Sequence, residues 1–303
     1  MKHYFVHPND ENKLKQLVWD CDRALEDRID SALDQMEDPS ELRLFGLTGP
    51  TCAGKTTAAK KITAMLEHCG MRVHVISVDD FYYDKEYLHK LAEEDPDVEI
   101  DYDSERTIDI ALFAECTQSL LEYKETQLPR FDFQSGMRVK GQCLIPRKND
   151  VFLFEGIQIL YPSIDAVLSR HDAYRSFYIC PASSIEVGGE EFLPNEIRLC
   201  RRLVRDYLHR ATLPDFTFYL WESVRANEDR NIFPYVSHCH ATIDSTMPYE
   251  MGMLKPYLEP LLCTIKPDNA YYGAAQELLK KLRNILPVPV EYRTQNSLYK
   301  EFI

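Results

Sequence analysis

The sequence predicts an α/β fold, namely a doubly wound parallel sheet with helices on both of its faces. Short apolar runs typical of buried strands alternate with longer segments of helical periodicity between residues 42 and 286. A glycine-rich stretch at residues 49–56 joins the first apolar run to the first helical segment. The chain has 303 residues, of which 45% are hydrophobic, so it can form one large domain or two small ones with an ordinary apolar core.

The glycine-rich stretch matches a phosphate-binding pattern. Gly49-Pro50-Thr51-Cys52-Ala53-Gly54-Lys55-Thr56 reads G-x-x-x-x-G-K-[ST], the P-loop pattern. The glycines allow a tight turn whose N–H groups form an anion nest, and Lys55 and Thr56 are placed to serve the β/γ-phosphates and Mg²⁺. A strand is expected at residues 42–47 and a helix at 57–69, which puts the phosphates at a helix N-terminus. The predicted fold is therefore of the P-loop NTPase type.

An N-terminal helical extension is predicted over residues 1–40. Its apolar residues recur at helical spacing between charged ones: Leu14, Leu17, Val18, Cys21, Leu25, Ile29, Leu33 and Met36. This helix either packs on the chain's own core or makes a dimer contact, so a homo-oligomer is left open.

Carboxylates follow two of the predicted strands, at positions typical of catalytic or metal-binding residues. Residues 73–78 form a strand signal that ends in Asp79 and Asp80, and we expect this strand to lie next to the P-loop strand. Ligands of open α/β sheets sit at the carboxyl ends of strands, so Asp79 is placed to take a proton from an acceptor hydroxyl. Residues 151–154 form a buried strand that ends at Glu155, which would hold Mg²⁺ together with Thr56.

The remaining segments complete the predicted alternation. Helices are expected at 105–123, 195–208, 214–231 and 273–286, and extended segments or strands at 128–133, 176–180 and 241–244. Arginines cluster on one face of the helix at 195–208: Arg198, Arg201, Arg202 and Arg205. We expect this face to clamp phosphate as a lid over about 192–231, with Arg201 and Arg205 offsetting charge on the transferred group.

Composition narrows the class of protein. The formal net charge of −14 argues against nucleic acid and anionic membranes as partners. Nothing resembles a signal peptide or an apolar run of about 20 residues, so a soluble, cytoplasmic protein is expected. The nine cysteines are scattered without a C-x-x-C pair, as in reduced proteins, and His238-Cys239-His240 does not have zinc-site spacing.

These motifs together resemble the uridine kinase and phosphoribulokinase family, most strongly the uridine kinases, over roughly residues 42–250. Residues 46–57, which include Thr57, resemble the family P-loop, and residues 154–157 resemble its E-G-I motif. The resemblance implies that Asp79 is the catalytic base, with Tyr82 beside the acceptor. In residues 102–109 it implies that Asp103 binds ribose hydroxyls, and residues 198–206 resemble the arginine-rich lid that closes on ATP.

One segment departs from the family. Nucleoside kinases carry Y-D-F-x-x-H-x-R, whereas this chain reads Phe131-Asp132-Phe133-Gln134-Ser135-Gly136-Met137-Arg138. Arg138 is kept, but Phe131 and Gly136 stand where the tyrosine and histidine approach the base. Phe131 and Arg138 are still expected at the substrate, with weak recognition of a pyrimidine.

The resemblance implies ATP- and Mg²⁺-dependent phosphorylation of a small-molecule hydroxyl, most simply a nucleoside 5′-OH. A kinase for a sugar phosphate or a pantothenate-like alcohol is the alternative among enzymes, and a nucleotide-binding regulatory protein without phosphotransfer is the alternative outside them. The chain has no N-K-x-D motif, which weighs against a GTPase, and it has both Asp79 and Glu155, which weighs against an inactive kinase. We expect a kinase domain at residues 41–290 and a C-terminal tail at 291–303.

Overall fold

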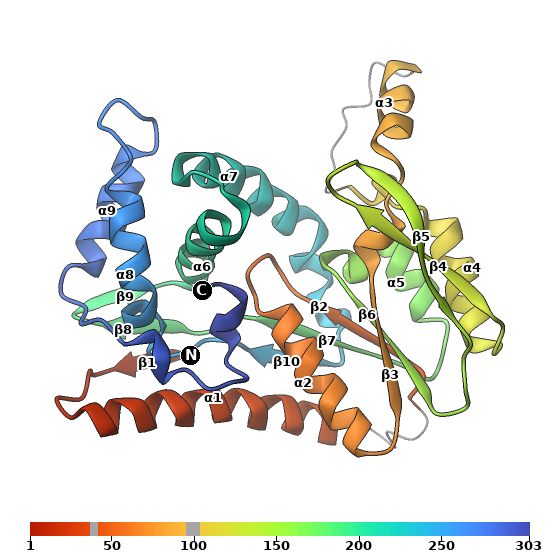
Figure 1. The fold of residues 1–303 in the computed structure, drawn as a ribbon, viewed down its shortest axis with the longest axis horizontal. Helices are drawn as coiled ribbons and strands as arrows, with labels where there is room; N and C mark the ends of the chain where they lie inside the picture. The colour runs from red at the N-terminus through yellow and green to blue at the C-terminus, as the bar shows by residue number, and fades with distance from the viewer. Residues whose placement is uncertain (37–41, 95–103) are drawn as a thin grey trace.

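The computed structural model describes residues 1–36, 42–94 and 104–303, and its centre is a parallel sheet (Figure 1). Within these residues the sheet has five strands in the order β10–β7–β2–β6–β3. Their bounds are β2 Leu44–Thr48, β3 Arg72–Ser77, β6 Asp150–Glu155, β7 Tyr174–Cys180 and β10 Ala241–Asp244. Every pairing between them is parallel, which confirms the predicted α/β fold.

Helices cover both faces of this sheet. The α-helices of the described residues are α1 Glu11–Asp34, α2 Lys55–His68, α3 Lys85–Glu94, α4 Ile110–Leu121, α5 Pro162–Leu168, α6 Pro194–Arg210, α7 Pro214–Asn231, α8 Glu250–Leu262 and α9 Tyr272–Leu282, of which α3 projects away from the sheet (Figure 1). Neighbouring residues of a strand point to opposite faces. Phe45 and Leu47 of β2 accordingly join the core built by α1, α2, α6, α8 and α9, whereas Leu44 joins the core built by α4 and α5. The sheet is doubly wound, as predicted.

Shorter elements surround the central sheet. Short 3₁₀ helices are η2 Val78–Phe81, η3 Glu105–Thr107, η4 Ile157–Leu160, η5 Phe233–His238, η6 Val290–Tyr292 and η7 Leu298–Glu301. Strands β4 Thr126–Asp132 and β5 Met137–Leu144 form an antiparallel hairpin. A small sheet joins β1 Lys2–Phe5 to β8 Ser184–Val187, which pairs in turn with β9 Glu190–Phe192.

The order of the strands corrects one expectation. We expected β3 beside the P-loop strand β2, but β6 lies between them and pairs with both. Glu155 is therefore in register with Leu47 of β2 on one side and with Ser77 of β3 on the other. Since parallel strands end at one edge of the sheet, the P-loop, Glu155 and Asp79 meet there through β6.

Both ends of the chain pack on the central domain. Val18 and Ile29 of α1 are fully buried in the same core as α2 and α6. Residues 291–303, expected to be a tail, contribute Leu298, Tyr299 and Phe302 to that core with no exposed surface. The segment lacks helical periodicity, so its burial had no pattern by which to predict it. Figure 1 places the C-terminus beside α6 and the loop between β2 and α2.

The state of the cysteines and the membrane-spanning potential of the helices also bear on the sequence-based expectations. The nine cysteines are free thiols. Over the described ranges, no helix has the length and apolarity to cross a bilayer.

Candidate active site

The P-loop connects β2 to α2 and needs its glycines. Gly49 has φ +155°, and a Cβ there would lie 2.1 Å from the carbonyl oxygen of Ile179. Gly54 has φ +97°, and a Cβ there would lie 2.1 Å from Leu298 Cδ1. Gly54 also caps α2 without a side-chain hydrogen bond in the described chain, so the first N–H groups of α2 can bind an anion.

Lys55 already points into this loop. Its Nζ donates hydrogen bonds to the carbonyl oxygens of Gly49 at 2.9 Å and Pro50 at 3.1 Å. Burial lowers the pKa of Lys55, and the charges of nearby carboxylates oppose that shift. Those carboxylates belong to Glu155, Glu301 and Asp79. The ammonium group is thus held among acidic side chains that come from separate parts of the chain.

Asp79 and Glu155 are both largely buried at the carboxyl edge of the sheet. Burial raises the pKa of Asp79, while a hydrogen bond from Gln158 and the charges of Lys55 and Arg210 lower it. Burial also raises the pKa of Glu155. The charge of Lys55 opposes this rise, and the charge of Asp79 adds to it. The structure therefore brings Lys55, Asp79 and Glu155 to the same edge of the sheet.

These residues fit a nucleoside triphosphate and Mg²⁺. The first N–H groups of α2 have no side-chain cap among the described residues, and the Lys55 ammonium group contacts carbonyl oxygens of the same loop. Thr56 is exposed at the start of α2, where its hydroxyl can reach a metal ion. The described residues contain no cluster of three or more His, Cys, Asp or Glu side chains that could hold a metal.

The predicted acceptor residues lie on the hairpin β4–β5 and the loop after β3. The rings of Tyr82 and Phe131 are 5.5 Å apart, and the N–H of Phe131 donates to Asp80 Oδ1 at 3.0 Å. Arg138 Nη1 pairs with Asp109 Oδ2 at 2.8 Å. The hairpin is therefore tied to the loop that carries Asp79. Asp103, the expected ligand of ribose hydroxyls, lies outside the described residues.

The local backbone conformation explains why a glycine stands at position 136, where the chain departs from the family pattern. Gly136 has φ +70°, and a Cβ there would lie 2.5 Å from Lys85 Cδ. Its carbonyl oxygen accepts a hydrogen bond from the N–H of Lys85 at 2.9 Å, which joins the hairpin to α3. A side chain at this position would be strained and would clash.

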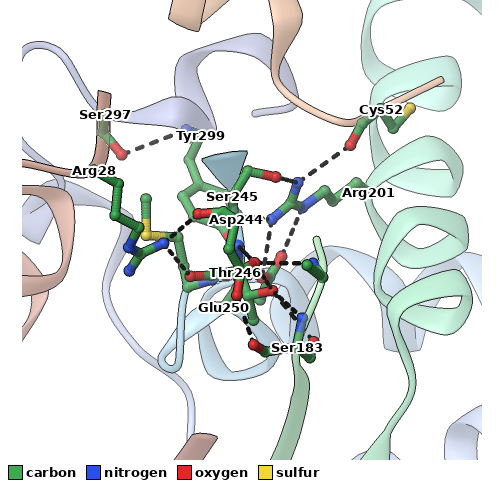
Figure 2. Close-up of polar contacts among 12 residues, drawn as sticks. Arg28, Cys52, Ser183, Arg201, Asp244, Ser245, Thr246, Glu250, Ser297 and Tyr299 are labelled. Atoms are coloured by element: carbon green, nitrogen blue, oxygen red, sulfur yellow. Dashed lines mark hydrogen bonds and ion pairs between the residues drawn. The ribbon is translucent and has the colours of Figure 1, made fainter. Parts of the chain in front are cut away.

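Arg198 and Arg201 of the expected phosphate clamp on α6 are buried in ion pairs, as Figure 2 shows for Arg201. Arg201 is fully buried, with Nε 2.7 Å from Glu250 Oε2 and Nη1 3.2 Å from the carbonyl oxygen of Cys52. Arg198 pairs in the same way with Glu228 at 2.6 Å and donates to the carbonyl oxygen of Thr51. These arginines hold the P-loop backbone through its carbonyl oxygens. Helical spacing showed their common face but not the carboxylates of α7 and α8 that meet it.

Three residues of the site had weak signals or none in the sequence. Arg205 pairs with Asp206 at 2.7 Å, and its role as a site residue stays a prediction, whereas Arg210, more than half exposed, interacts electrostatically with Asp79. Arg210 follows the arginine cluster of the predicted helix at 195–208, and the sequence assigned it no role. Gln158 and Glu301 had no signal, because their contacts join segments far apart in the chain.

A phosphate loop at a helix start, with a lysine and two strand-end carboxylates around it, defines a P-loop nucleotide-binding protein. The chain belongs to the phosphoribulokinase / uridine kinase family, whose model matches residues 44–250.

Individual relatives are more distant. The chain is 30% identical over 125 residues to uridine-cytidine kinase C of Dictyostelium discoideum, which covers 41% of this chain and 25% of that protein. It is 27% identical over 203 residues to uridine-cytidine kinase B of the same organism, covering 66% of this chain and 73% of that protein. Among solved structures, D-glycerate 3-kinase from Cryptococcus neoformans is similar at a TM-score of 0.46 with 14% identity, covering 70% of this chain and 87% of the other.

Proposed function

We propose that this chain is a kinase that transfers a phosphoryl group from ATP to a hydroxyl of a small molecule, with nucleosides as the acceptor class. The proposal is carried by one observation: Lys55, Glu155 and Asp79 interact electrostatically at the carboxyl edge of three adjacent strands. Phosphoryl transfer to a hydroxyl is catalysed mainly by positioning and charge stabilisation, with a base near the hydroxyl, and not by a covalent intermediate.

Each residue then has a defined task. Lys55 and the N–H groups at the start of α2 hold the β- and γ-phosphates, and Thr56 and Glu155 hold Mg²⁺. A Mg²⁺ ion held there would supply positive charge that offsets the charge of the phosphates. Asp79 orients the acceptor hydroxyl and accepts its proton. Arg205 and Arg210 offset charge on the transferred group from the end of α6.

The names of the relatives and the glycine at position 136 both bear on which compound accepts the phosphoryl group. The uridine-cytidine kinases among the relatives support a nucleoside. Gly136 favours a second candidate, a kinase for another ribose-like or sugar alcohol, because its lack of a side chain removes a hydrogen-bonding group from the hairpin. We therefore expect uridine to be used with little preference over other ribose-like compounds. ADP release measured across nucleosides and sugar phosphates tests this, and strong selectivity for uridine or cytidine would contradict it.

Substitutions at Lys55 and Asp79 test the chemistry itself. Lys55→Ala should abolish phosphotransfer and leave the circular dichroism spectrum unchanged, because the ammonium contacts loop carbonyls and not the core. Asp79→Asn keeps the shape but removes the base, so it should lower kcat on the order of 10²- to 10⁴-fold with little change in KM. Near-normal turnover in Lys55→Ala would contradict the proposal, and binding of ATP without ADP release for any acceptor would favour a regulatory protein.

A further inference from the structure

Gln158 contacts the proposed base directly and has no role assigned so far. It lies in η4, just after Glu155 and Gly156, and 1% of its surface is exposed. Its Nε2 donates to Asp79 Oδ1 at 2.5 Å and to the hydroxyl oxygen of Tyr82 at 2.9 Å. The amide therefore joins the proposed base to the residue expected beside the acceptor.

Among the described residues, the oxygen of this amide has no hydrogen-bond partner. Oε1 of Gln158 is buried without a hydrogen bond, and a Cβ on Gly156 would lie 2.4 Å from it. Turning the amide over would place this oxygen against the carboxylate of Asp79, where two acceptors repel. A buried acceptor without a donor destabilises the fold, so the contact with Asp79 is held at a cost in stability.

We infer that Gln158 is a positioning residue for Asp79. Its N–H group holds Oδ1, which leaves Oδ2 to meet the acceptor hydroxyl, and the same amide fixes the Tyr82 hydroxyl beside it. The inference rests on the proposed role of Asp79 as the base. A carboxylate free to rotate would spend less time aligned for proton transfer, which lowers the rate of the chemical step.

Gln158→Leu separates positioning from folding. It should lower kcat about 10- to 100-fold with KM values for ATP and acceptor within about two-fold, since it acts on alignment and not on binding. In an Asp79→Asn background the same change should have little further effect, because no base is left to align. Gln118→Leu, on the exposed face of α4, serves as the control and should change neither constant.

The outcomes discriminate between the two claims. Additive losses in the double variant, or a change in KM alone, would overturn the inference and show a structural role. A large loss in Asp79→Asn with normal kcat in Gln158→Leu would overturn the inference only. A normal kcat in Asp79→Asn would overturn the proposed role of Asp79 and the inference with it.

A second and independent observation concerns residues 297–303, which we call the C-terminal strap. Leu298 of the strap packs against Gly54 of the P-loop and is fully buried. The ring of Phe302 lies 5.4 Å from the Arg201 guanidinium, and Figure 2 shows Tyr299 beside Arg201 and Glu250. The strap is thus part of the wall behind the phosphate loop.

One strap residue faces the phosphate site with a charge. Glu301 Oε2 accepts a hydrogen bond from the Thr57 hydroxyl at 3.4 Å, and its charge acts on Lys55 and Glu155. Loop N–H groups, a lysine and a helix N-terminus attract an anion, and here the chain supplies one of its own. Phosphates bound at the same place would meet the Glu301 carboxylate as a like charge.

We propose that Glu301 sets the affinity of the site for nucleotide by competing with phosphate for the P-loop and Thr57. Because Tyr299 and Phe302 on either side of it are fully buried, only the side chain has to turn away when nucleotide binds, while the strap stays in place. This rests on the proposed binding of ATP at the P-loop. The competing carboxylate predicts weaker binding than the loop alone would give.

Glu301→Gln tests this by direct binding of a fluorescent ATP analogue with Mg²⁺. Removing the charge while keeping the shape should lower Kd roughly three- to ten-fold, and the gain should shrink at high salt because the effect is electrostatic. Glu291→Gln, an exposed change just before the strap, should leave Kd unchanged. Lys55→Ala should weaken binding and thereby shows that the analogue occupies the P-loop.

An equal or higher Kd for Glu301→Gln would overturn competition, and a higher one would show that Glu301 contributes to binding. If the wild-type chain binds the analogue normally, neither of these outcomes contradicts the proposed function. Failure of the analogue to bind either form would overturn both claims.

Discussion

The buried arginines of α6 each meet a carboxylate from another helix. Arg201 and Glu250 are both fully buried, and Arg198 and Glu228 are each 2% exposed. Each guanidinium also donates to a carbonyl oxygen of the P-loop, which its planar fork allows at the same time as a carboxylate pair. At the scale of single residues, these arginines support the backbone of the phosphate loop through its carbonyl oxygens.

Arg201→Met should therefore act on folding. Removing one partner of a buried pair leaves the Glu250 carboxylate without its cation, which costs about 3–5 kcal/mol of unfolding free energy. Urea denaturation followed by circular dichroism measures it. Adding Glu250→Leu should recover part of the loss, because no buried charge then remains unpaired.

Arg230→Met, an exposed change on α7, is the matched control and should stay within about 0.5 kcal/mol of the wild type. Normal stability in Arg201→Met together with lost nucleotide binding would restore Arg201 as a phosphate ligand.

At the scale of elements, the joint between β3 and β6 depends on Asp150. Its carboxylate, 1% exposed, accepts from Arg72 Nε at 2.7 Å and from the N–H of Arg147 at 2.9 Å. His74 lies 3.2 Å away on the same strand as Arg72. These contacts fix the start of β6, and the far end of β6 carries Glu155.

Asp150→Asn should weaken this joint in a pH-dependent way. Burial opposes ionisation of Asp150, but hydrogen bonds from Arg72 and Arg147 and the charge of His74 outweigh it and hold its pKa below the ordinary value. The stabilisation is thus full above the unfolded pKa of about 4 and is lost as pH falls through the folded value. The variant should lose about 2–3 kcal/mol at pH 7 and approach the wild type below about pH 4.

Urea midpoints measured from pH 7 to pH 3 give this difference, with Asp172→Asn as an exposed control. A loss of equal size at every pH would show that shape and not charge holds the joint.

Elements were predictable where the pattern was local. The apolar runs gave β2, β6, β7 and β10 within a few residues, and the P-loop motif placed Lys55 and Thr56. Helix α8 was missed because it contains Pro256 and Pro260, which ordinarily end a helix. Gln158 and Glu301, the partners of Asp79 and Thr57, could not be predicted, since they come from distant segments of the chain.

At the scale of the whole molecule, the two ends of the chain meet around one buried carboxylate. Asp22 of α1 is 3% exposed and accepts hydrogen bonds from Tyr249, Thr294 and Ser297. The last two precede Leu298, which packs on Gly54. The N-terminal helix thus helps to hold the segment that lines the phosphate loop, so the predicted extension and tail share one core with the residues between them.

Asp22→Ala tests this connection between the two ends. The change removes the acceptor of the Thr294 hydroxyl at 2.7 Å and of the buried Tyr249 hydroxyl at 2.5 Å, so it should cost about 3 kcal/mol of unfolding free energy. Amide hydrogen exchange should also speed up in residues 291–303 and at the start of α2, because the strap loses its tether. Asp20→Ala, exposed on the same helix, should change neither. Faster exchange confined to residues 291–303, with normal global stability, would show that the end of the chain opens as a separate unit and that α1 does not stabilise the phosphate loop.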